Sequence, residues 1–600
     1  MLVSLLTLAS GCANFGPGTV ASIFLRGPNQ DDRTYMQEQS AFYQLSGTTA
    51  LLLLVGFYGL TFLMSLMIGK KKENVDSYMV SNNAVGFGLS AASMIATWIW
   101  AASFYASATS GYQYGLSGPI HYGFWGALMI LFIYPYGRRF RALAPKAHTL
   151  AEVMHARHGT SSQLIMAVSN LLGSCISLMV NFTAAGALVS VLSPLSFIQG
   201  VLIAGLGVLS YTLWSGFRAS VMTDFAQLVA MILAAIVIIP LIFFNAGGTD
   251  MLAANWSNLS SEQADFFSTK AILEQGAPYF VAVLAYAIGN QTIAQRLFAV
   301  REDLIKSTFL TATVGYGAVV IGLGMLGMLA LFVGLTPAGG DMNNIIPQMA
   351  STYLPPFGIA LFFILVVGSL SSTADSDLSA LSSIMMTDIY GKNMARGTPD
   401  PKRMLWWGRV TMIVATMIGV VFASLRLDIL VMLVFVGALW GAIVFPVIVS
   451  FYWDKVTNKA FTTSVICAVV LFAVARFELL PLKGIIAVLF ELCASAGMGV
   501  VLGLMTFAFF NRKIAIFVAI ATMIIAIPNA VGFLRDYPVL LSSLTSYGIS
   551  ALVCVAMSWN NKERFDFALL AERVTSFQKQ TDMDEQTSTD VDGEVAPARA

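Results

Sequence analysis

Charged residues are scarce in this 600-residue chain, where lysine, arginine, aspartate and glutamate together make up 11% and the formal net charge is +1. A soluble globular domain carries roughly 25% charged residues. Because 57% of the residues are hydrophobic and the mean hydropathy is +0.76, the sequence predicts an integral membrane protein surrounded by lipid. The near-neutral charge argues against nucleic acid as a partner.

Cysteine and histidine are also few, and neither follows a ligand pattern. The five cysteines are scattered without a CxxC pair, so no disulfide framework or transition-metal site is expected. His155 and His158 lie near Glu152, which would suit a metal, but a solvated loop is the preferred interpretation. The chain has no HExxH, GxSxG or histidine-rich span. We therefore expect no enzyme and no cofactor.

Fifteen apolar stretches are long enough to cross a bilayer. They cover 44–69, 84–112, 118–138, 163–190, 196–214, 219–244, 273–294, 307–334, 356–388, 403–424, 428–452, 460–478, 484–510, 513–533 and 539–558. Lysine and arginine collect in one set of connecting loops, whereas 245–272, 335–355 and 479–483 hold few. By the positive-inside rule and an odd span count, the N terminus lies outside and the C terminus in the cytoplasm. The expected location is the plasma membrane, or the inner membrane of a bacterium.

The two ends of the chain differ from these spans. Residues 1–25 are apolar and resemble a signal peptide without a basic start; an extra partial span is the alternative. Residues 559–600 are polar, end in an acidic stretch and are predicted to form a disordered cytoplasmic tail.

The span 356–388 carries a polar insert at its centre. At about 100° per residue, its hydroxyls form one stripe on a helix. These are Ser369, Ser372, Thr373, Ser376, Ser379 and Ser383. Hydroxyls alone can serve helix packing or bond their own backbone. Asp375 and Asp377 at the edges of the stripe favour an ion route instead, because carboxylates are costly inside a bilayer.

The span 84–112 is small and polar through its middle, with Trp98 and Trp100 at bilayer depth. Small residues allow this helix to break, which exposes backbone carbonyls that suit a small cation. Close packing of small residues is the alternative.

Two further spans have polar ends. The span 273–294 ends with Asn290, Gln291, Gln295 and Arg296. The span 219–244 begins near Asp224, which could also cap its helix.

These elements, in this order, resemble the sodium:solute symporter family. The resemblance is carried by Gly216-x-x-Ala219-x3-Thr223-Asp224-x2-Gln227, Asn290-Gln291-x3-Gln295-Arg296 and Ser372-Thr373…Ser382-Ser383…Thr387-Asp388-Ile389-Tyr390. Within the family the chain is most similar to the high-affinity urea symporters. Their pattern is seen in Trp98-Ile-Trp100-Ala-Ala, Tyr114-Gly115-Leu-Ser117-Gly118-Pro119 and Arg141-Ala-Leu-Ala-Pro145-Lys-Ala-His148. The Asp375-Ser-Asp377 insert departs from the urea carriers.

The resemblance implies an all-α, LeuT-type core of two inverted five-helix repeats, about 84–244 and 273–452. The helix at 44–69 precedes this core of 84–452, and additional transmembrane helices fill 460–558. It also implies a sodium site. The matching positions are the carbonyls of Ala92, Ile95 and Ser369 with the hydroxyls of Ser372 and Thr373. Residues three apart on a helix share a face, which agrees with this cage.

The resemblance implies a second cation site at Asp224 and Ser376, and Asp375 adds an acid that could carry a proton instead. For a planar amide such as urea, we expect carbonyl acceptors, a donor and flat aromatic walls. The candidate substrate residues are Trp98, Trp100, Tyr105, Tyr286, Asn290 and Gln291. The predicted function is Na+-coupled symport of a small polar solute, favouring urea, by alternating access. Proline or another amino acid, a monocarboxylate, a polyamine or H+ coupling are the alternatives; a channel or a sensor is less favoured.

Overall fold

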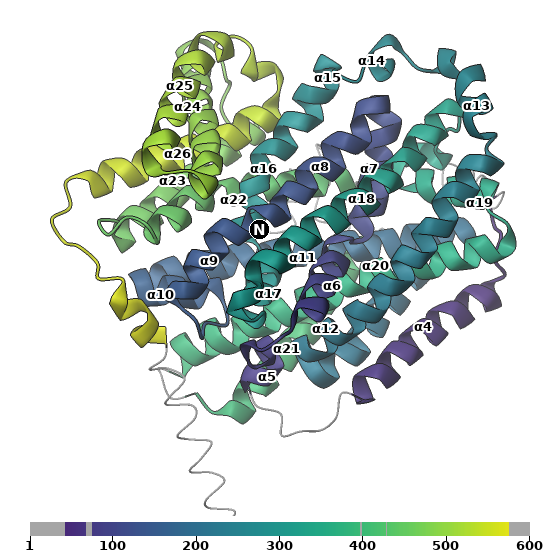
Figure 1. The fold of residues 1–600 in the computed structure, drawn as a ribbon, viewed down its shortest axis with the longest axis horizontal. Coiled ribbons are helices and arrows are strands. Elements are labelled where there is room, and N and C mark those ends of the chain that lie inside the picture. The colour runs from purple at the N-terminus through teal and green to yellow at the C-terminus, as the bar shows by residue number, and fades with distance from the viewer. Residues whose placement is uncertain (1–41, 68–74, 396–398, 428, 575–600) are drawn as a thin grey trace, which may run out of the picture.

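The computed structural model describes residues 42–67, 75–395, 399–427 and 429–574. Within these ranges the chain is helical, and its one β-type contact is an isolated parallel bridge between Val85 and Val300 (Figure 1). The apolar N-terminal segment predicted over 1–25 lies outside the described residues.

The first half of the described chain forms the following helices. They are α4 (Gly47–Met67), α5 (Val75–Val80), α6 (Phe87–Trp98), α7 (Ala101–Tyr114), α8 (Gly118–Leu131), α9 (Ile133–Leu143), α10 (Leu150–His158), α11 (Thr160–Leu192), α12 (Phe197–Asn245), α13 (Gly248–Ala254), α14 (Ser261–Ala264) and α15 (Thr269–Ala271). The second half of the described chain is also helical. Its helices are α16 (Ala277–Gly289), α17 (Gln291–Ala299), α18 (Ile305–Phe332), α19 (Ile345–Tyr353), α20 (Pro356–Ser383) with the π-helical η8 (Ile384–Met394), α21 (Pro401–Ala423), α22 (Ile429–Ser450), α23 (Asn458–Arg476), α24 (Gly484–Phe509), α25 (Arg512–Ala530) and α26 (Pro538–Trp559).

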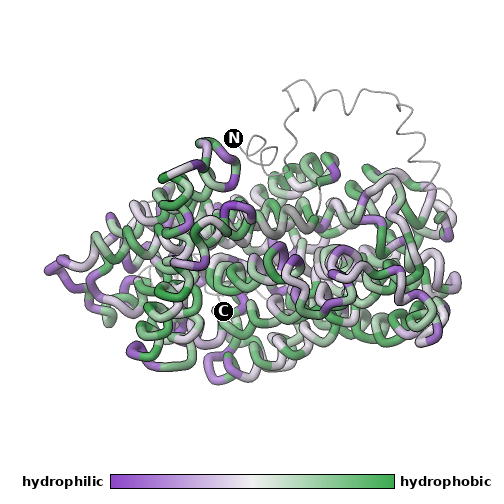
Figure 2. Tube along the Cα trace, turned by 90° about the horizontal axis from the view of Figure 1, so that it is seen from above, coloured by the Kyte–Doolittle hydropathy of each residue, from purple (hydrophilic) through white to green (hydrophobic). Residues whose placement is uncertain are grey.

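Thirteen helical segments of the described chain are long and apolar enough to cross a membrane, and two shorter apolar helices, Phe87–Trp98 and Phe435–Ser450, accompany them. Together they account for the fifteen stretches expected from the sequence. Figure 2 shows hydrophobic residues along most of the helical segments and hydrophilic ones mainly at the connecting turns. The outer helix α25 is the clearest case, because Phe517 is 72% and Ile524 65% exposed. Such side chains are stable only against lipid or another apolar partner.

Three breaks interrupt the core helices. The first separates α6 from α7 at Ile99 and Trp100, and the second separates α16 from α17 at Asn290. The third lies inside α12 at Gly216, whose φ of 56° and ψ of −139° are not helical. A Cβ at this glycine would lie 2.7 Å from the Tyr78 ring, so both the backbone angle and the close approach require glycine.

Helix α20 runs through the middle of the core. It packs against α12 on one side and α11 on another, and it also contacts α6. Helices α23 to α26 group at one side of the molecule, with α26 against α22, and α4 lies at the opposite edge (Figure 1). The polar insert of α20 is therefore surrounded by protein: Ser372, Asp375, Ser376 and Asp377 are each at most 1% exposed.

The start of the C-terminal tail is ordered, which the sequence interpretation missed. Leu570 and Val574 are buried, and the Phe565 amide donates to the Asp454 carbonyl at 3.0 Å. The Arg157 guanidinium lies 4.1 Å from the Phe565 ring centroid. A few apolar side chains within a polar segment provide this anchorage, so the prediction of disorder is wrong for residues 560–574. Residues 575–600 lie outside the described part of the chain.

Candidate functional site: a buried ion-pair network beside a broken helix

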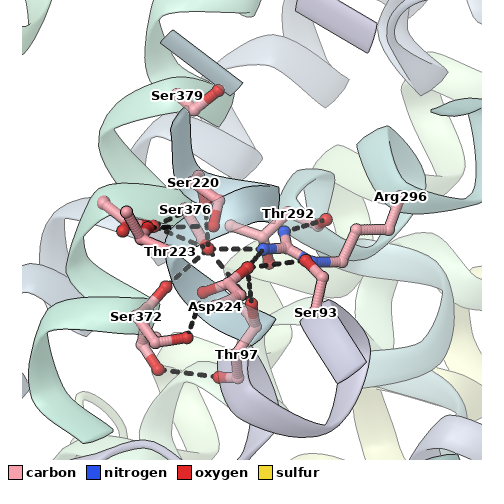
Figure 3. Close-up of polar contacts among 12 residues, drawn as sticks. Ser93, Thr97, Ser220, Thr223, Asp224, Thr292, Arg296, Ser372, Ser376 and Ser379 are labelled. Carbon is pink, nitrogen blue, oxygen red and sulfur yellow. Dashed lines mark hydrogen bonds and ion pairs between the residues drawn. The ribbon is translucent and has the colours of Figure 1, made fainter. Parts of the chain in front are cut away.

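Four core helices meet at a buried carboxylate, Asp224 of α12 (Figure 3). Ser93 of α6 donates to Asp224 Oδ2 at 2.6 Å, and the Ser372 hydroxyl of α20 donates to Oδ1. Arg296 of α17 places Nη2 2.9 Å from Oδ2. Both members of the ion pair are buried, with side chains 4% and 0% exposed. Such a pair is tolerated in an apolar interior only when hydrogen bonds satisfy its remaining atoms.

The Arg296 guanidinium is satisfied in this way. Nη2 also donates to Ser376 Oγ at 2.6 Å, Nε donates to Ser93 Oγ at 3.0 Å, and Nη1 donates to the Thr292 carbonyl at 3.2 Å. The Phe217 ring lies 5.6 Å from its central carbon. The planar fork of an arginine suits this geometry, since it presents several donors in fixed directions.

Asp375 forms the second half of the network, one residue from Ser376. Tyr211 donates to its Oδ2 at 2.8 Å and Ser220 donates to its Oδ1 at 2.6 Å. Ser376 Oγ lies 3.2 Å from both Asp375 Oδ1 and Ser220 Oγ. The three residues predicted as a second cation or proton site, Asp224, Asp375 and Ser376, are therefore brought together. Arg296 already provides a positive charge beside two of them.

The residues predicted as a sodium site lie where α20 meets the broken end of α6. Thr373 Oγ1 donates to the Thr97 carbonyl at 2.7 Å, and Ser369 Oγ donates to the Ile99 carbonyl at 2.5 Å. Ala92 and Ile95 belong to the same helix α6 and are buried. The Ile95 carbonyl accepts from the Ile99 amide at 2.8 Å, the last helical bond before the break. The carbonyls that these α20 hydroxyls meet belong to Thr97 and Ile99 rather than to the predicted Ala92 and Ile95, and the Ser372 hydroxyl donates to Asp224 instead.

Two predicted substrate residues belong to an aromatic cluster at the break. The Trp98 and Tyr286 ring centroids are 6.1 Å apart in an edge-on arrangement, and Trp98 Nε1 donates to the Gly126 carbonyl at 3.2 Å. Tyr316 and Trp440, which the sequence interpretation missed, complete the cluster at 6.5 Å from Trp98 and 5.2 Å from Tyr286. Their helices lie far apart in the sequence, so spacing gave no signal for them.

The other predicted substrate residues have separate roles in the structure. Tyr105 donates to the Ala184 carbonyl at 3.0 Å, and Trp100 precedes the first turn of α7. Asn290 caps α17 by accepting from the Thr292 amide at 2.9 Å. Gln291 faces another segment: its Nε2 donates to the His148 carbonyl at 3.1 Å and its Oε1 accepts from the Leu150 amide at 3.2 Å. The structure therefore does not place Gln291 against the aromatic cluster.

His148 is the centre of a second polar network, outside the membrane-spanning segments. Its Nε2 lies 2.7 Å from Asp76 Oδ1 and its Nδ1 lies 3.3 Å from Glu152 Oε2. Burial favours the neutral ring, but the hydrogen bonds to Asp76 and Glu152 outweigh it and raise the pKa of His148 to about 10. The same contacts lower the pKa values of both carboxyls against the effect of burial. His148 and Glu152 of this triad are buried, whereas the Asp76 side chain is 41% exposed, and Lys392 Nζ also lies 3.7 Å from Glu152 Oε1.

The sequence held one unused signal for the main network. A charged residue inside a membrane span needs a partner of opposite charge. Arg296 and Asp224 carry opposite charges and were therefore candidates for such a pair. Ser93 and Thr97 lie four residues apart on one face of α6, where Thr97 Oγ1 reaches Ser376 Oγ at 3.1 Å. The partners of Asp375, Tyr211 and Ser220, flank the break at Gly216. No local pattern marks them.

The fold and the site define a multi-pass membrane transporter built from two repeats with broken helices. A family model for the sodium:solute symporter family matches residues 78–468. The chain belongs to this family.

Relatives and solved structures agree with this assignment. A probable urea active transporter 1 of Schizosaccharomyces pombe is 23% identical over 60% of this chain, and the match covers 58% of the length of that relative. A sodium/pantothenate symporter of Haemophilus influenzae is 22% identical over 66% of this chain and 83% of that one. The structure of a Na+-coupled sialic acid symporter superposes with a TM-score of 0.61 at 17% identity, covering 81% of this chain and 98% of that one. This likeness shows the LeuT-type fold.

Proposed function

We propose that this protein couples the inward movement of Na+ to the uptake of a small polar solute, with urea as the favoured substrate. The observation that carries the proposal is the meeting of Ser369 and Thr373 with the Ile99 and Thr97 carbonyls at the broken end of α6. Oxygen ligands of this hard, uncharged kind suit a small cation.

The expected Na+ ligands are the carbonyls of Ala92, Ile95 and Ser369 and the hydroxyls of Ser372 and Thr373. In the described arrangement the Thr373 hydroxyl satisfies a carbonyl of α6 directly. A Na+ ion entering beside this contact would take the Thr373 hydroxyl as a ligand and hold α20 and α6 in one register. Because all five ligands are neutral, the ion would be bound weakly enough to leave again. Such binding couples occupancy of the site to the relative position of the two helices.

The favoured substrate follows from the aromatic cluster and from the relatives. Trp98 and Tyr286 provide flat apolar walls at the first helix break, and Asn290 lies at the second break, four residues after Tyr286. A planar molecule with several N–H groups, such as urea, would stack on such rings and donate to exposed carbonyls. The pantothenate carrier among the relatives keeps another small metabolite, such as an amino acid or a monocarboxylate, as the second candidate.

In this proposal Na+ binding stabilises the outward-facing state, the solute closes the outer path, and both leave from the inward-facing state. The N terminus lies outside and the C terminus in the cytoplasm of a plasma or inner membrane. H+ coupling is the runner-up for the ion, because Asp375 is buried and receives hydroxyl donors but no direct ion pair within the described chain.

The test is uptake of labelled urea into proteoliposomes under an imposed inward Na+ gradient, beside a matched pH gradient. We expect accumulation above equilibrium with Na+ and its loss in a Ser372→Ala/Thr373→Ala variant. Thr373→Ser, which keeps the hydroxyl, should retain most of the uptake. Accumulation under the pH gradient alone would overturn Na+ coupling. No urea uptake under either gradient would reject urea and direct the assay to other small solutes.

A further inference from the structure

Helix α20 has a second polar face that the ion-pair network does not use. Ser369, Thr373 and Asp377 follow each other at intervals of four residues, so they lie one above another along the helix. Ser372 and Ser376 face α12 and α17, where they contact Asp224 and Arg296. Asp377 thus lies one helical turn beyond Thr373, on the side of the proposed Na+ ligands and toward the C-terminal end of α20.

Helix α11 presents a matching polar stripe. It packs against α20, and Ser174 and Ser177 of α11 lie close to the Asp377 carboxylate. One turn further along α11, Asn181 Oδ1 accepts from the Ala101 amide at 3.3 Å, at the start of α7. Polar side chains of α11 and α20 therefore lie along the interface of these two helices, from the helix break to Asp377.

The Asp377 carboxylate is incompletely satisfied. The residue is 1% exposed, and its Oδ2 has no hydrogen-bond partner in the described part of the chain. Arg296 forms its ion pair with Asp224 and not with Asp377. A buried carboxylate without a counter-charge is costly, and such groups persist where a proton or a metal cation completes them.

We propose that Asp377, with Ser174 and Ser177, is a binding station for the transported Na+ between the Ser369–Thr373 site and the C-terminal end of α20. This inference rests on the proposed Na+ coupling. The station combines one carboxylate with two hydroxyls, so it attracts a cation more strongly than the neutral site one turn away. A Na+ ion leaving Thr373 passes to Asp377 before it reaches the far end of the helix. The station lowers the barrier to ion release without belonging to the site that senses the solute.

The test is equilibrium binding of radioactive Na+ to the purified full-length protein without any solute, so that the identity of the substrate does not enter. We expect Asp377→Asn to bind one Na+ fewer per chain than the unsubstituted protein. Asp388→Asn is the control, since Asp388 is also a buried carboxylate of the segment that continues α20 but has donors on both oxygens, Gln163 at 3.0 Å and Thr149 at 2.8 Å. It should keep the full Na+ count.

A second variant covers the case in which Asp377→Asn fails to fold. The Ser174→Ala/Ser177→Ala protein retains the carboxylate and should raise the half-saturating Na+ concentration of one ion by about tenfold. A full Na+ count in Asp377→Asn, or unchanged binding in the serine variant, would overturn the proposal. The Ser372→Ala/Thr373→Ala protein distinguishes the Asp377 site from the Na+ site of the proposed function. If this variant loses one Na+ per chain but keeps the Na+ that depends on Asp377, the protein has two distinct sites.

Alkylation of Cys175 provides a local probe of Na+ binding at Asp377. It lies next to Ser174 in α11 and is buried. In a variant keeping only this cysteine, Na+ at constant ionic strength should slow alkylation by N-ethylmaleimide severalfold, and Asp377→Asn should remove that protection. Protection that survives in Asp377→Asn would mean that Na+ acts through a conformational change elsewhere, which would also contradict the proposal.

Discussion

Arg296 Nη2 lies 2.9 Å from Asp224 Oδ2 and 2.6 Å from Ser376 Oγ, so one guanidinium connects α17 to both α12 and α20. These three helices come from separate parts of the sequence and are held together by this one side chain. The pair therefore makes the position of α17 depend on the charge state of the Asp224 site. A cation that binds near Asp224 has to compete with Arg296 for the same oxygens.

Removing the arginine alone should destabilise the protein strongly. Arg296→Ala leaves a fully buried carboxylate without its counter-charge, at a cost of about 3–5 kcal/mol. We expect a clear drop in the thermal unfolding midpoint in detergent and loss of uptake. The double variant Arg296→Gln/Asp224→Asn should recover part of the stability, because two neutral groups can hydrogen-bond to each other. A double variant that loses as much stability as Arg296→Gln and Asp224→Asn together would show that the pair does not interact.

The Thr373 hydroxyl should control Na+ affinity. A hydrogen bond or ligand contact to a charged group is worth about 1.5–3 kcal/mol, so Thr373→Ala should raise the half-saturating Na+ concentration for uptake by about tenfold or more. Maximal uptake at saturating Na+ should change less. Thr373→Ser is the control, and its Na+ dependence should stay close to that of the unsubstituted protein. Equal Na+ dependence of the alanine variant would remove Thr373 from the ion site.

The His148 triad predicts a stability profile with pH. The pKa of His148 is raised from its ordinary value to about 10 in the folded protein, so its contribution is complete below the unfolded pKa of about 6.5 and is lost as the pH rises through about 10. The lowered pKa values of Asp76 and Glu152 act in the opposite direction and are lost as the pH falls through them.

We therefore expect the unfolding midpoint to fall between about pH 7 and pH 10, and this fall to be smaller in His148→Gln. The measurement is thermal unfolding of the purified protein over that range. His155→Gln serves as a control, because burial lowers the pKa of His155 and its neutral form is kept throughout the range. Identical pH profiles for the unsubstituted protein and His148→Gln would contradict a charged His148.

Two substitutions at Asn290 can distinguish a role in substrate binding from a role in helix capping. Its side chain accepts from the Thr292 amide at 2.9 Å, so Asn290→Ala removes an N-cap worth about 1 kcal/mol. Asn290→Ser keeps a capping oxygen but loses the amide. If the amide binds the solute, both variants should raise the half-saturating urea concentration, and only the alanine variant should unfold more easily. Unchanged urea affinity in the serine variant would exclude the Asn290 amide from the substrate site.

The sequence determined the membrane-spanning architecture and the location of its polar centre. Long apolar segments have few alternatives to helices in a bilayer, because every backbone group must be paired internally. Asp224, Asp375 and the hydroxyls of α20 could be recognised as functional candidates from their positions within apolar spans, because polar groups are costly in a bilayer. The expected segment at 84–112 and the pair at 196–214 and 219–244 proved to be helices broken at Ile99–Trp100 and Gly216.

Tertiary structure decided which of these groups meet. The pairing of Arg296 with Asp224, the donors Tyr211 and Ser220 at Asp375, and the docking of Gln291 on His148 join residues 72 to 164 positions apart. Helical periodicity fixes which side chains share a face, but the partner across the interface depends on how helices from both repeats pack. The sequence therefore determined which polar groups lie inside the membrane spans, whereas the packing of the helices determined which of these groups contact each other.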